Sequence, residues 1–214
     1  MGILRKITGI FNPWYTDPMP DRDLEFLFET GSLRNVQRGW RQHFGMDCAN
    51  DLEHSFRVAM IALMLARKEG VKNEEKVLKM ALIHDLAESR TADHDYISKV
   101  YVTADEERAA KDLFEGTILA DLEREVLAEY EERQSLEAKI VKDADNLDVD
   151  IEMKEIADRG SKLPGKWAAF RKMVRDEKLY TESAKEMWNS LQGADPASWH
   201  LRANKWLKIP DAGK

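Results

Sequence analysis

Cysteine is nearly absent from this chain, since Cys48 is the only one among its 214 residues. No internal disulfide can form, and nothing in the sequence requires an oxidising compartment. Apolar runs are also short, and none approaches the roughly 20 residues that a transmembrane helix needs. The first residues lack the long apolar segment of a signal peptide. We therefore expect a cytoplasmic protein that does not span a membrane.

Strand signals and an excess of positive charge are missing as well. The sequence has no alternating Val, Ile and Thr runs joined by hairpin turns. Its formal net charge is -7, whereas a general nucleic-acid binder needs clustered Lys and Arg to neutralise phosphates. We expect no nucleic acid polymer as a partner. A small anionic substrate remains possible, because binding it needs only a local cation or metal.

Helical periodicity is present along most of the chain. Phe56, Met60 and Met64 recur at four-residue steps, and Gly70 is placed to end that helix. Asn73 is placed as the N-cap of the next helical stretch, 74–89. Thr103 and Glu106 match a capping box, and Gly160 is placed to end a later helix. Further amphipathic segments run through residues 164–178, 181–192 and 196–207.

These patterns predict an all-α fold with about seven to eight helices and no sheet. We expect three parts in the chain. Residues 1–20 contain three prolines and are expected to form an N-terminal arm. Residues 21–160 are expected to form the core, and 161–214 to form C-terminal helices packed on the same domain.

Imidazole and carboxylate groups recur within the predicted apolar helices. His54, the pair His84 and Asp85, and an aspartate of the stretch KDADNLDVD lie on three separate predicted helices. A buried ionisable group costs several kcal/mol unless it is paired or coordinated, and a divalent metal between the helices would explain all of them. Neighbouring helix residues point about 100° apart, so His84 and Asp85 share an ion only if it lies close against their helix. Glu88 falls on the same face, beside the pair.

A simpler interpretation exists for each residue alone. A lone histidine in an apolar helix is more often a core residue than a metal ligand, and a single His-Asp dipeptide is a weak signal. A tryptophan is usually a core residue, and an arginine is usually a solvated cation. The joint pattern, and not any one residue, favours a metal site.

The joint pattern resembles the HD-domain superfamily of metal-dependent phosphohydrolases. The stretches EHSFRVAMIALMLA, ALIHDLAESRTAD and EYEERQSLEAKIVKDADNLD are similar to successive blocks of the branch that contains bacterial 5'-deoxynucleotidases and their eukaryotic relatives. The resemblance covers roughly residues 33–156. It implies an HD-domain helical bundle.

The resemblance also implies roles for individual residues. The implied metal ligands are His54, His84, Asp85 and Asp145. Glu88 matches the acidic residue that assists proton transfer, and Asp93 matches a substrate-contacting aspartate. The stretch QRGW resembles the family segment that lines the substrate pocket, which implies substrate contacts for Arg38 and Trp40.

The fourth ligand has an alternative. Helical periodicity alone places Asp148 nearer the apolar stripe and so favours it, whereas the block VKDAD resembles the family's ligand block and favours Asp145. We follow the block, and we expect Asp143 and Asp150 to lie on the solvated face. His94 is the only histidine between the His-Asp pair and this block; we expect a loop residue there, and a site with a single metal.

The resemblance implies hydrolysis of (deoxy)nucleoside 5'-monophosphates to nucleoside and phosphate. The metal could be Mn, Co, Mg, Fe, Ni or Zn. Two alternatives stay open: hydrolysis of another phosphate ester or a signalling nucleotide, and a non-catalytic helical module with a structural metal. The resemblance and the six tryptophans are compatible with a homodimer, although core packing explains the tryptophans equally well.

Overall fold

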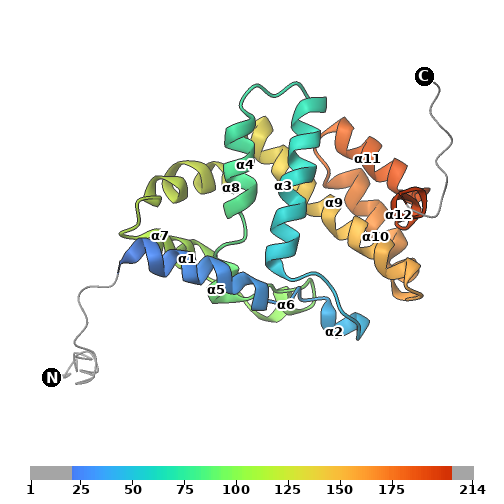
Figure 1. The fold of residues 1–214 in the computed structure, drawn as a ribbon, viewed down its shortest axis with the longest axis horizontal. Coiled ribbons are helices and arrows are strands. Elements are labelled where there is room, and N and C mark those ends of the chain that lie inside the picture. Colours follow the sequence, from blue (N-terminus) through green and yellow to red (C-terminus); the bar gives the residue numbers. More distant parts are fainter. Residues whose placement is uncertain (1–20, 204–214) are drawn as a thin grey trace.

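The computed structural model describes residues 21–203 of the chain, and the predicted N-terminal arm lies outside them, as do residues 204–214. The described residues form helices joined by short loops (Figure 1). The β-type pairing among them is limited to one isolated antiparallel bridge between Gln37 and Asn50. The predicted all-α fold class is therefore confirmed.

Seven helices of nine residues or more carry the described part of the fold, in line with the expected number. They are α1 (Arg22–Ser32), α3 (Asp51–Lys68), α4 (Glu74–Ile83), α7 (Glu106–Phe114), α9 (Leu136–Asp158), α10 (Leu163–Glu177) and α11 (Glu182–Gln192). Shorter segments join or follow them, namely η1 (Leu33–Asn35), α2 (Arg41–Phe44), α5 (Glu88–Thr91), α6 (Ser98–Tyr101), the π-helical turn η2 (Leu122–Leu127), α8 (Ala128–Glu132) and α12 (Ser198–Arg202).

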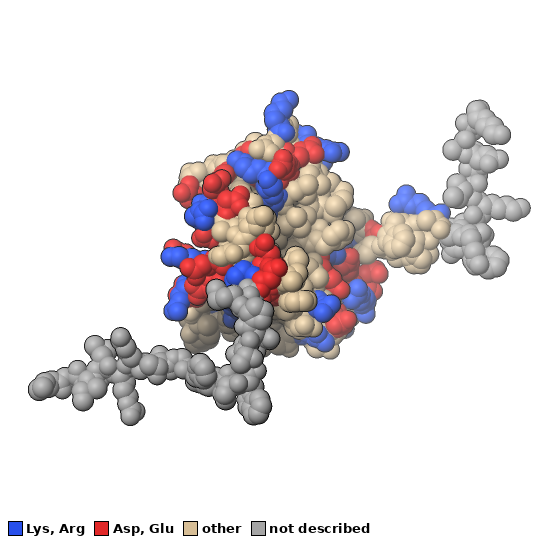
Figure 2. Space-filling model, turned by 60° about the vertical axis from the view of Figure 1, so that its left-hand side comes forward, with Lys and Arg blue, Asp and Glu red and all other residues tan. Residues whose placement is uncertain are grey.

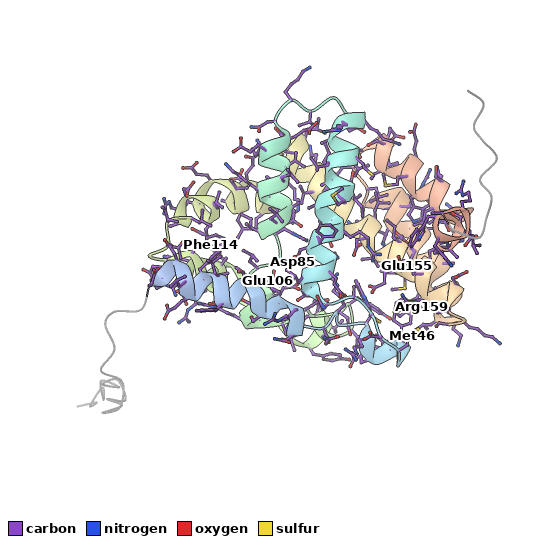
Figure 3. The ribbon with its side chains drawn as sticks, viewed as in Figure 1. Met46, Asp85, Glu106, Phe114, Glu155 and Arg159 are labelled. Atoms are coloured by element: carbon purple, nitrogen blue, oxygen red, sulfur yellow. The ribbon has the colours of Figure 1, made fainter. Side chains whose placement is uncertain are left out.

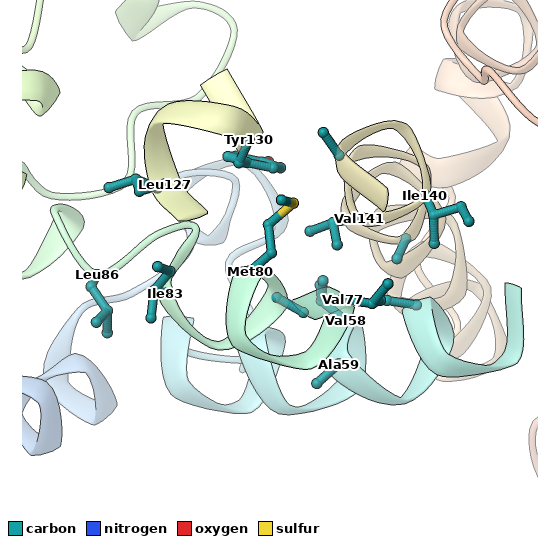
Figure 4. Close-up of a cluster of buried hydrophobic side chains, with 14 of the residues drawn as sticks. Val58, Ala59, Val77, Met80, Ile83, Leu86, Leu127, Tyr130, Ile140 and Val141 are labelled. Atoms are coloured by element: carbon teal, nitrogen blue, oxygen red, sulfur yellow. The ribbon is translucent and has the colours of Figure 1, made fainter. Parts of the chain in front are cut away.

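The main apolar core lies between α3, α4 and α9 (Figure 4). Its fully buried side chains include Val58 of α3, Val77 and Met80 of α4, and Ile140 and Val141 of α9. Fully burying one such side chain stabilises the fold by about 1.5–3 kcal/mol. This packing fixes α3 and α9, which carry His54 and Asp145, and α4, which leads directly into His84 and Asp85. On its other side, α9 packs against α10 and α11.

The apolar stripe that predicted α3 is not the buried face of that helix. Phe56, Met60 and Met64 are exposed, Phe56 to 69%. The buried face carries Val58 and Leu65 instead. The helix is apolar around most of its circumference, so residue spacing identifies a helix but does not select the face that packs.

The predicted helix ends were mostly correct. The Asn73 side chain caps α4, and Gly70 and Gly160 follow α3 and α9 with φ of 72° and 100°, a conformation that favours glycine. The predicted capping box at Thr103 was wrong. The side chain of Asp105 caps α7 instead, because Asp is an equally good N-cap and lies directly before the helix.

Asp143 and Asp150 are buried, against the prediction that both face solvent. The Asp143 carboxylate accepts hydrogen bonds from the backbone N–H groups of Tyr180 and Thr181 and from the Thr181 hydroxyl, at 2.7–2.8 Å. Asp150 pairs with Arg171 of α10 at 2.7 Å. The prediction failed because α10 and α11 cover a side of α9 that periodicity within α9 does not reveal.

No helix within residues 21–203 is both long and apolar enough to cross a bilayer. Acidic and basic side chains are interspersed over the face shown in Figure 2, with uncharged surface between them. On this face, positive charge is not gathered into a patch of the kind that binds a nucleic acid backbone.

We predict that Asp143→Ala lowers the free energy of unfolding by about 3 kcal/mol or more, because three donors, two of them in buried hydrogen bonds, lose their acceptor. Urea unfolding measures the change. Asp158→Ala is the matched control, since Asp158 is exposed near the end of the same helix, and it should stay within about 0.5 kcal/mol of the wild type. Equal stabilities of the two variants would contradict the structural role of Asp143.

Candidate metal centre

The four predicted ligands come from three segments of the chain and meet at one point. His54 lies on α3 and Asp145 on α9, while His84 and Asp85 directly follow α4. One donor atom of each residue lies within 4.8 Å of a donor atom of every other. Figure 3 shows Asp85 between the lower parts of α3 and α4. The structure thus brings the four side chains together.

The spacing of the donor atoms suits a single ion. His54 Nε2 lies 3.3 Å from both Asp85 Oδ2 and Asp145 Oδ1, and His84 Nε2 lies 3.1 Å from Asp85 Oδ2. Ligands bound about 2.0–2.2 Å from one divalent ion lie about 3 Å from one another. The measured separations match that value.

The two histidines are oriented as metal ligands are. His54 Nδ1 is hydrogen-bonded to Asp148 Oδ2 at 2.6 Å, and His84 Nδ1 to the Ala81 carbonyl at 2.9 Å. Both Nε2 atoms are buried and have no hydrogen-bond partner. An unpartnered buried polar atom costs about 1–3 kcal/mol, and a metal-bound histidine typically uses its other nitrogen for such a bond. The residues therefore fit a divalent cation.

Asp145 and Asp148 occupy opposite sides of the His54 ring. Asp145 Oδ1 faces Nε2, inside the cluster, while its Oδ2 accepts a hydrogen bond from Lys142 Nζ at 2.7 Å. Asp148 binds Nδ1, outside the cluster, and its second oxygen is held by Arg57. This geometry favours Asp145 as the fourth ligand and places Asp148 where its carboxylate can orient the imidazole.

His84 and Asp85 do not continue α4, contrary to the helix predicted for 74–89. The helix ends at Ile83, and turns lead to α5. Backbone bonds there join residues three apart, as from the Glu88 N–H to the Asp85 carbonyl at 3.0 Å. Such tightened turns are common at helix ends. Because the helix ends before them, the His84 and Asp85 side chains can point to the same place. In a regular α-helix, neighbouring side chains point about 100° apart.

Arg38 is buried among three carboxylates. Its Nε lies 3.2 Å from Asp93 Oδ2, and its Nη1 lies 3.5 Å from Asp85 Oδ2 and 3.7 Å from Asp51 Oδ1. The neighbouring Gly39 donates its N–H to Asp93 Oδ2 at 3.0 Å. A Cβ on this glycine would lie 2.7 Å from the backbone nitrogen of Asp95. Only glycine therefore lets the chain at residue 39 pack this closely against the loop that carries Asp93.

Glu88 is buried beside Arg38, and its pKa lies far above the ordinary value of a glutamate. Burial, followed by the charges of Asp85, Asp93 and Asp51, raises the pKa of Glu88 to about 11. Burial also raises the pKa of Asp51 to about 6. Donor atoms of Asp51, Glu88 and Asp93 lie within 4.8 Å of one another, so these three could also hold a cation. Sequence reasoning missed Asp51, because an aspartate in the first turn of a helix is ordinary.

Trp40 is fixed by a glutamate that sequence reasoning also missed. The indole N–H donates to Glu152 Oε2 at 3.0 Å, and Glu152 Oε1 accepts the N–H of Ala49 at 2.6 Å. The guanidinium of Arg38 lies over the Trp40 ring, 4.7 Å from its centroid. Glu152 is buried two turns after Asp145 on α9. No sequence signal distinguishes it from a solvated helical glutamate.

Seven of the eight predicted site residues line one cleft of about 450 Å³; they are Arg38, Trp40, His84, Asp85, Glu88, Asp93 and Asp145. The eighth, His54, is fully buried. His94 lies in the loop between α5 and α6, as predicted, and also lines the cleft. The cleft volume is in the usual range of small-molecule sites.

The sequence matches the HD domain family over residues 30–190. The 5'-deoxynucleotidase HDDC2 of Danio rerio is 33% identical over 160 residues, covering 70% of this chain and 76% of the relative. The 5'-deoxynucleotidase YGK1 of Saccharomyces cerevisiae is 31% identical over 158 residues, covering 69% and 70%. A conserved hypothetical protein from Pyrococcus furiosus has a solved structure that aligns with a TM-score of 0.67 at 30% identity, covering 79% of this chain and 98% of the other. Because the family match spans α3, α4 and α9 together with α10 and most of α11, the chain belongs to the HD domain family.

Proposed function

We propose that this protein is a metal-dependent phosphohydrolase that converts (deoxy)nucleoside 5'-monophosphates and water into nucleoside and phosphate. The observation that carries the proposal is the pair of buried Nε2 atoms of His54 and His84, which make no hydrogen bond and face two carboxylates at a cleft. The names of the relatives from Danio rerio and Saccharomyces cerevisiae, both 5'-deoxynucleotidases, support the substrate class.

His54, His84, Asp85 and Asp145 would hold one divalent cation, with Mn, Co, Mg, Fe, Ni and Zn as the candidates. When bound, such a cation supplies charge neutralisation for the phosphate and lowers the pKa of a bound water. Asp148 keeps the His54 imidazole in the tautomer that leaves Nε2 free for the ion. Lys142 holds one oxygen of Asp145 and leaves the other for the cluster.

Glu88 is the proposed general acid. A pKa raised to about 11 by burial and neighbouring carboxylates keeps its carboxyl group protonated at neutral pH. The bond that breaks joins phosphorus to the 5' oxygen of the sugar, and this oxygen must gain a proton as it leaves. A protonated Glu88 on the cleft wall can provide that proton.

Arg38, Trp40 and Asp93 are the proposed substrate contacts. The guanidinium of Arg38 presents a planar set of donors that suits two phosphate oxygens. The carboxylate of Asp93 holds the Nε side of this group at 3.2 Å, and the Trp40 ring lies against it. Both neighbours pre-organise the arginine, and all three residues line the cleft.

The cytoplasmic location and the homodimer are part of this proposal. They rest on the sequence arguments given above. Gel filtration with light scattering tests the homodimer, and a monomeric mass at working concentration would rule it out.

Replacing the residue that orients His54 is predicted to weaken metal binding. Asp148→Asn should reduce Mn²⁺ or Co²⁺ affinity about 10- to 100-fold, because the imidazole loses its charged partner. Isothermal titration calorimetry measures the affinity, and Asp158→Asn, an exposed position on the same helix, is the control. Asp145→Asn should weaken binding further. If Asp148→Asn abolished binding while Asp145→Asn did not, the ligand assignment would be reversed.

If Glu88 is the general acid, replacing it should slow turnover without preventing metal binding. Glu88→Gln should lower kcat for a deoxynucleoside 5'-monophosphate by about 10²- to 10⁴-fold, while the protein still binds the metal. Phosphate release in the presence of Mn²⁺, Co²⁺ or Mg²⁺ measures the rate. Glu125→Gln, at an exposed position, should match the wild type. Unchanged turnover by Glu88→Gln would refute the role, and wild-type protein that releases phosphate from no monophosphate would refute the proposed substrate.

A further inference from the structure

Two aromatic side chains of the cleft have no role in the function proposed above. Tyr96, in the loop between α5 and α6, and Phe170, on α10, both line the cleft, and each is 48% exposed. Their ring centroids are 6.0 Å apart, with an interplanar angle of 36°. Two half-exposed rings on a cleft wall offer an apolar face to a planar ligand.

The other Tyr and Trp rings of the cleft lining, within residues 21–203, are already occupied. The Trp40 ring carries the guanidinium of Arg38. Tyr130 is 3% exposed, and the guanidinium of Arg133 lies over its ring. Among the Phe, Tyr and Trp rings of the lining, Tyr96 and Phe170 are therefore the most exposed, at 48% each, whereas Trp40 is only partly exposed.

Other aromatic side chains pack against the Tyr96 side of this aromatic pair. Trp167 packs edge-on against Tyr96, with centroids 5.6 Å apart at 88°, and Phe44 packs against Trp167 at 5.3 Å. The loop is held as well, since the buried Asp95 accepts a hydrogen bond from Gln42 Nε2 at 2.7 Å. This support fixes the position of the Tyr96 ring before a ligand arrives, which lowers the entropy cost of binding.

Both rings lie on segments tied to the candidate metal centre. Tyr96 lies three residues after Asp93, which contacts Arg38. Phe170 is followed by Arg171, whose Nη2 donates to the backbone carbonyl of Asn146 at 2.9 Å. Asn146 directly follows the candidate fourth ligand. The same cleft therefore joins the phosphate-binding groups to the aromatic pair.

We propose that Tyr96 and Phe170 form a nucleobase subsite, on which the base of the substrate stacks while its 5'-phosphate lies at the metal cluster and Arg38. This inference rests on the proposed function and names the part of the substrate that the cleft recognises beyond its phosphate. Every nucleobase has a π face, so stacking on aromatic rings tolerates all of them. The subsite selects nucleotides over sugar phosphates and discriminates weakly between bases.

The test compares a deoxynucleoside 5'-monophosphate with deoxyribose 5-phosphate, which lacks the base, on the full chain with Mn²⁺ or Co²⁺. Phe170→Ala and Tyr96→Ala should raise the KM of the nucleotide about 5- to 150-fold, the loss expected for one stacked base. Their kcat/KM for the sugar phosphate should stay at the wild-type value. The inhibition constant of the free deoxynucleoside should rise by the same factor as the KM. Phe170→Trp keeps an aromatic ring at this position and should therefore keep the nucleotide affinity that Phe170→Ala loses. Phe28→Ala, which removes an exposed phenylalanine of α1, is the control.

An equal loss on both substrates would mean that the variants displace the catalytic groups, and it would overturn the subsite. An unchanged KM for the nucleotide would also overturn it, and so would a wild type that does not prefer the nucleotide to the sugar phosphate. In those cases the proposed function stands, because the nucleotide is still hydrolysed. A wild type that hydrolyses no nucleotide would reject the proposed function, and the subsite with it.

Discussion

The candidate site depends on how two buried imidazoles are held. His54 and His84 each use Nδ1 for a hydrogen bond, to Asp148 and to the Ala81 carbonyl, and each leaves Nε2 buried without a hydrogen bond, 3.1–3.3 Å from carboxylate oxygens of the cluster. Such an arrangement is unfavourable unless something satisfies the free nitrogens. A divalent cation does so, and it also offsets the charges of Asp85 and Asp145, which face the same point. The arrangement of the side chains themselves therefore suits a divalent cation.

Packing between helices makes this arrangement possible. The core between α3, α4 and α9 fixes the three segments that carry the ligands, and the tightened turn after Ile83 aims two consecutive residues at one point. The neighbouring carboxylates also act on the other groups of the site. Those of Asp51 and Asp93 hold Arg38, and they raise the pKa of Glu88 beyond the effect of burial alone. The proposed acid Glu88, the candidate cation site and the proposed phosphate-binding Arg38 thus influence one another electrostatically.

The sequence allowed the fold class, the helix ends at Gly70 and Gly160, and the set of residues around the cleft to be predicted, because caps, periodicity and the His-Asp pattern are local signals. It did not show the buried face of α3, since Phe56 and Val58 are both apolar. Asp143 and Glu152 were missed for another reason: their burial is produced by partners far along the chain, Thr181 and Trp40. The choice between Asp145 and Asp148 also required three dimensions, because it depends on which side of the His54 ring each carboxylate occupies.

The most direct test of this account is the position of a bound metal in crystals of the protein grown with Co²⁺, located by anomalous diffraction. The account predicts a peak about 2.0–2.2 Å from Nε2 of both His54 and His84, with Asp85 and Asp145 completing the protein ligands and Asp148 on the far side of the His54 ring. Cobalt found only at other positions, or coordinated by Asp148 in place of Asp145, would contradict it.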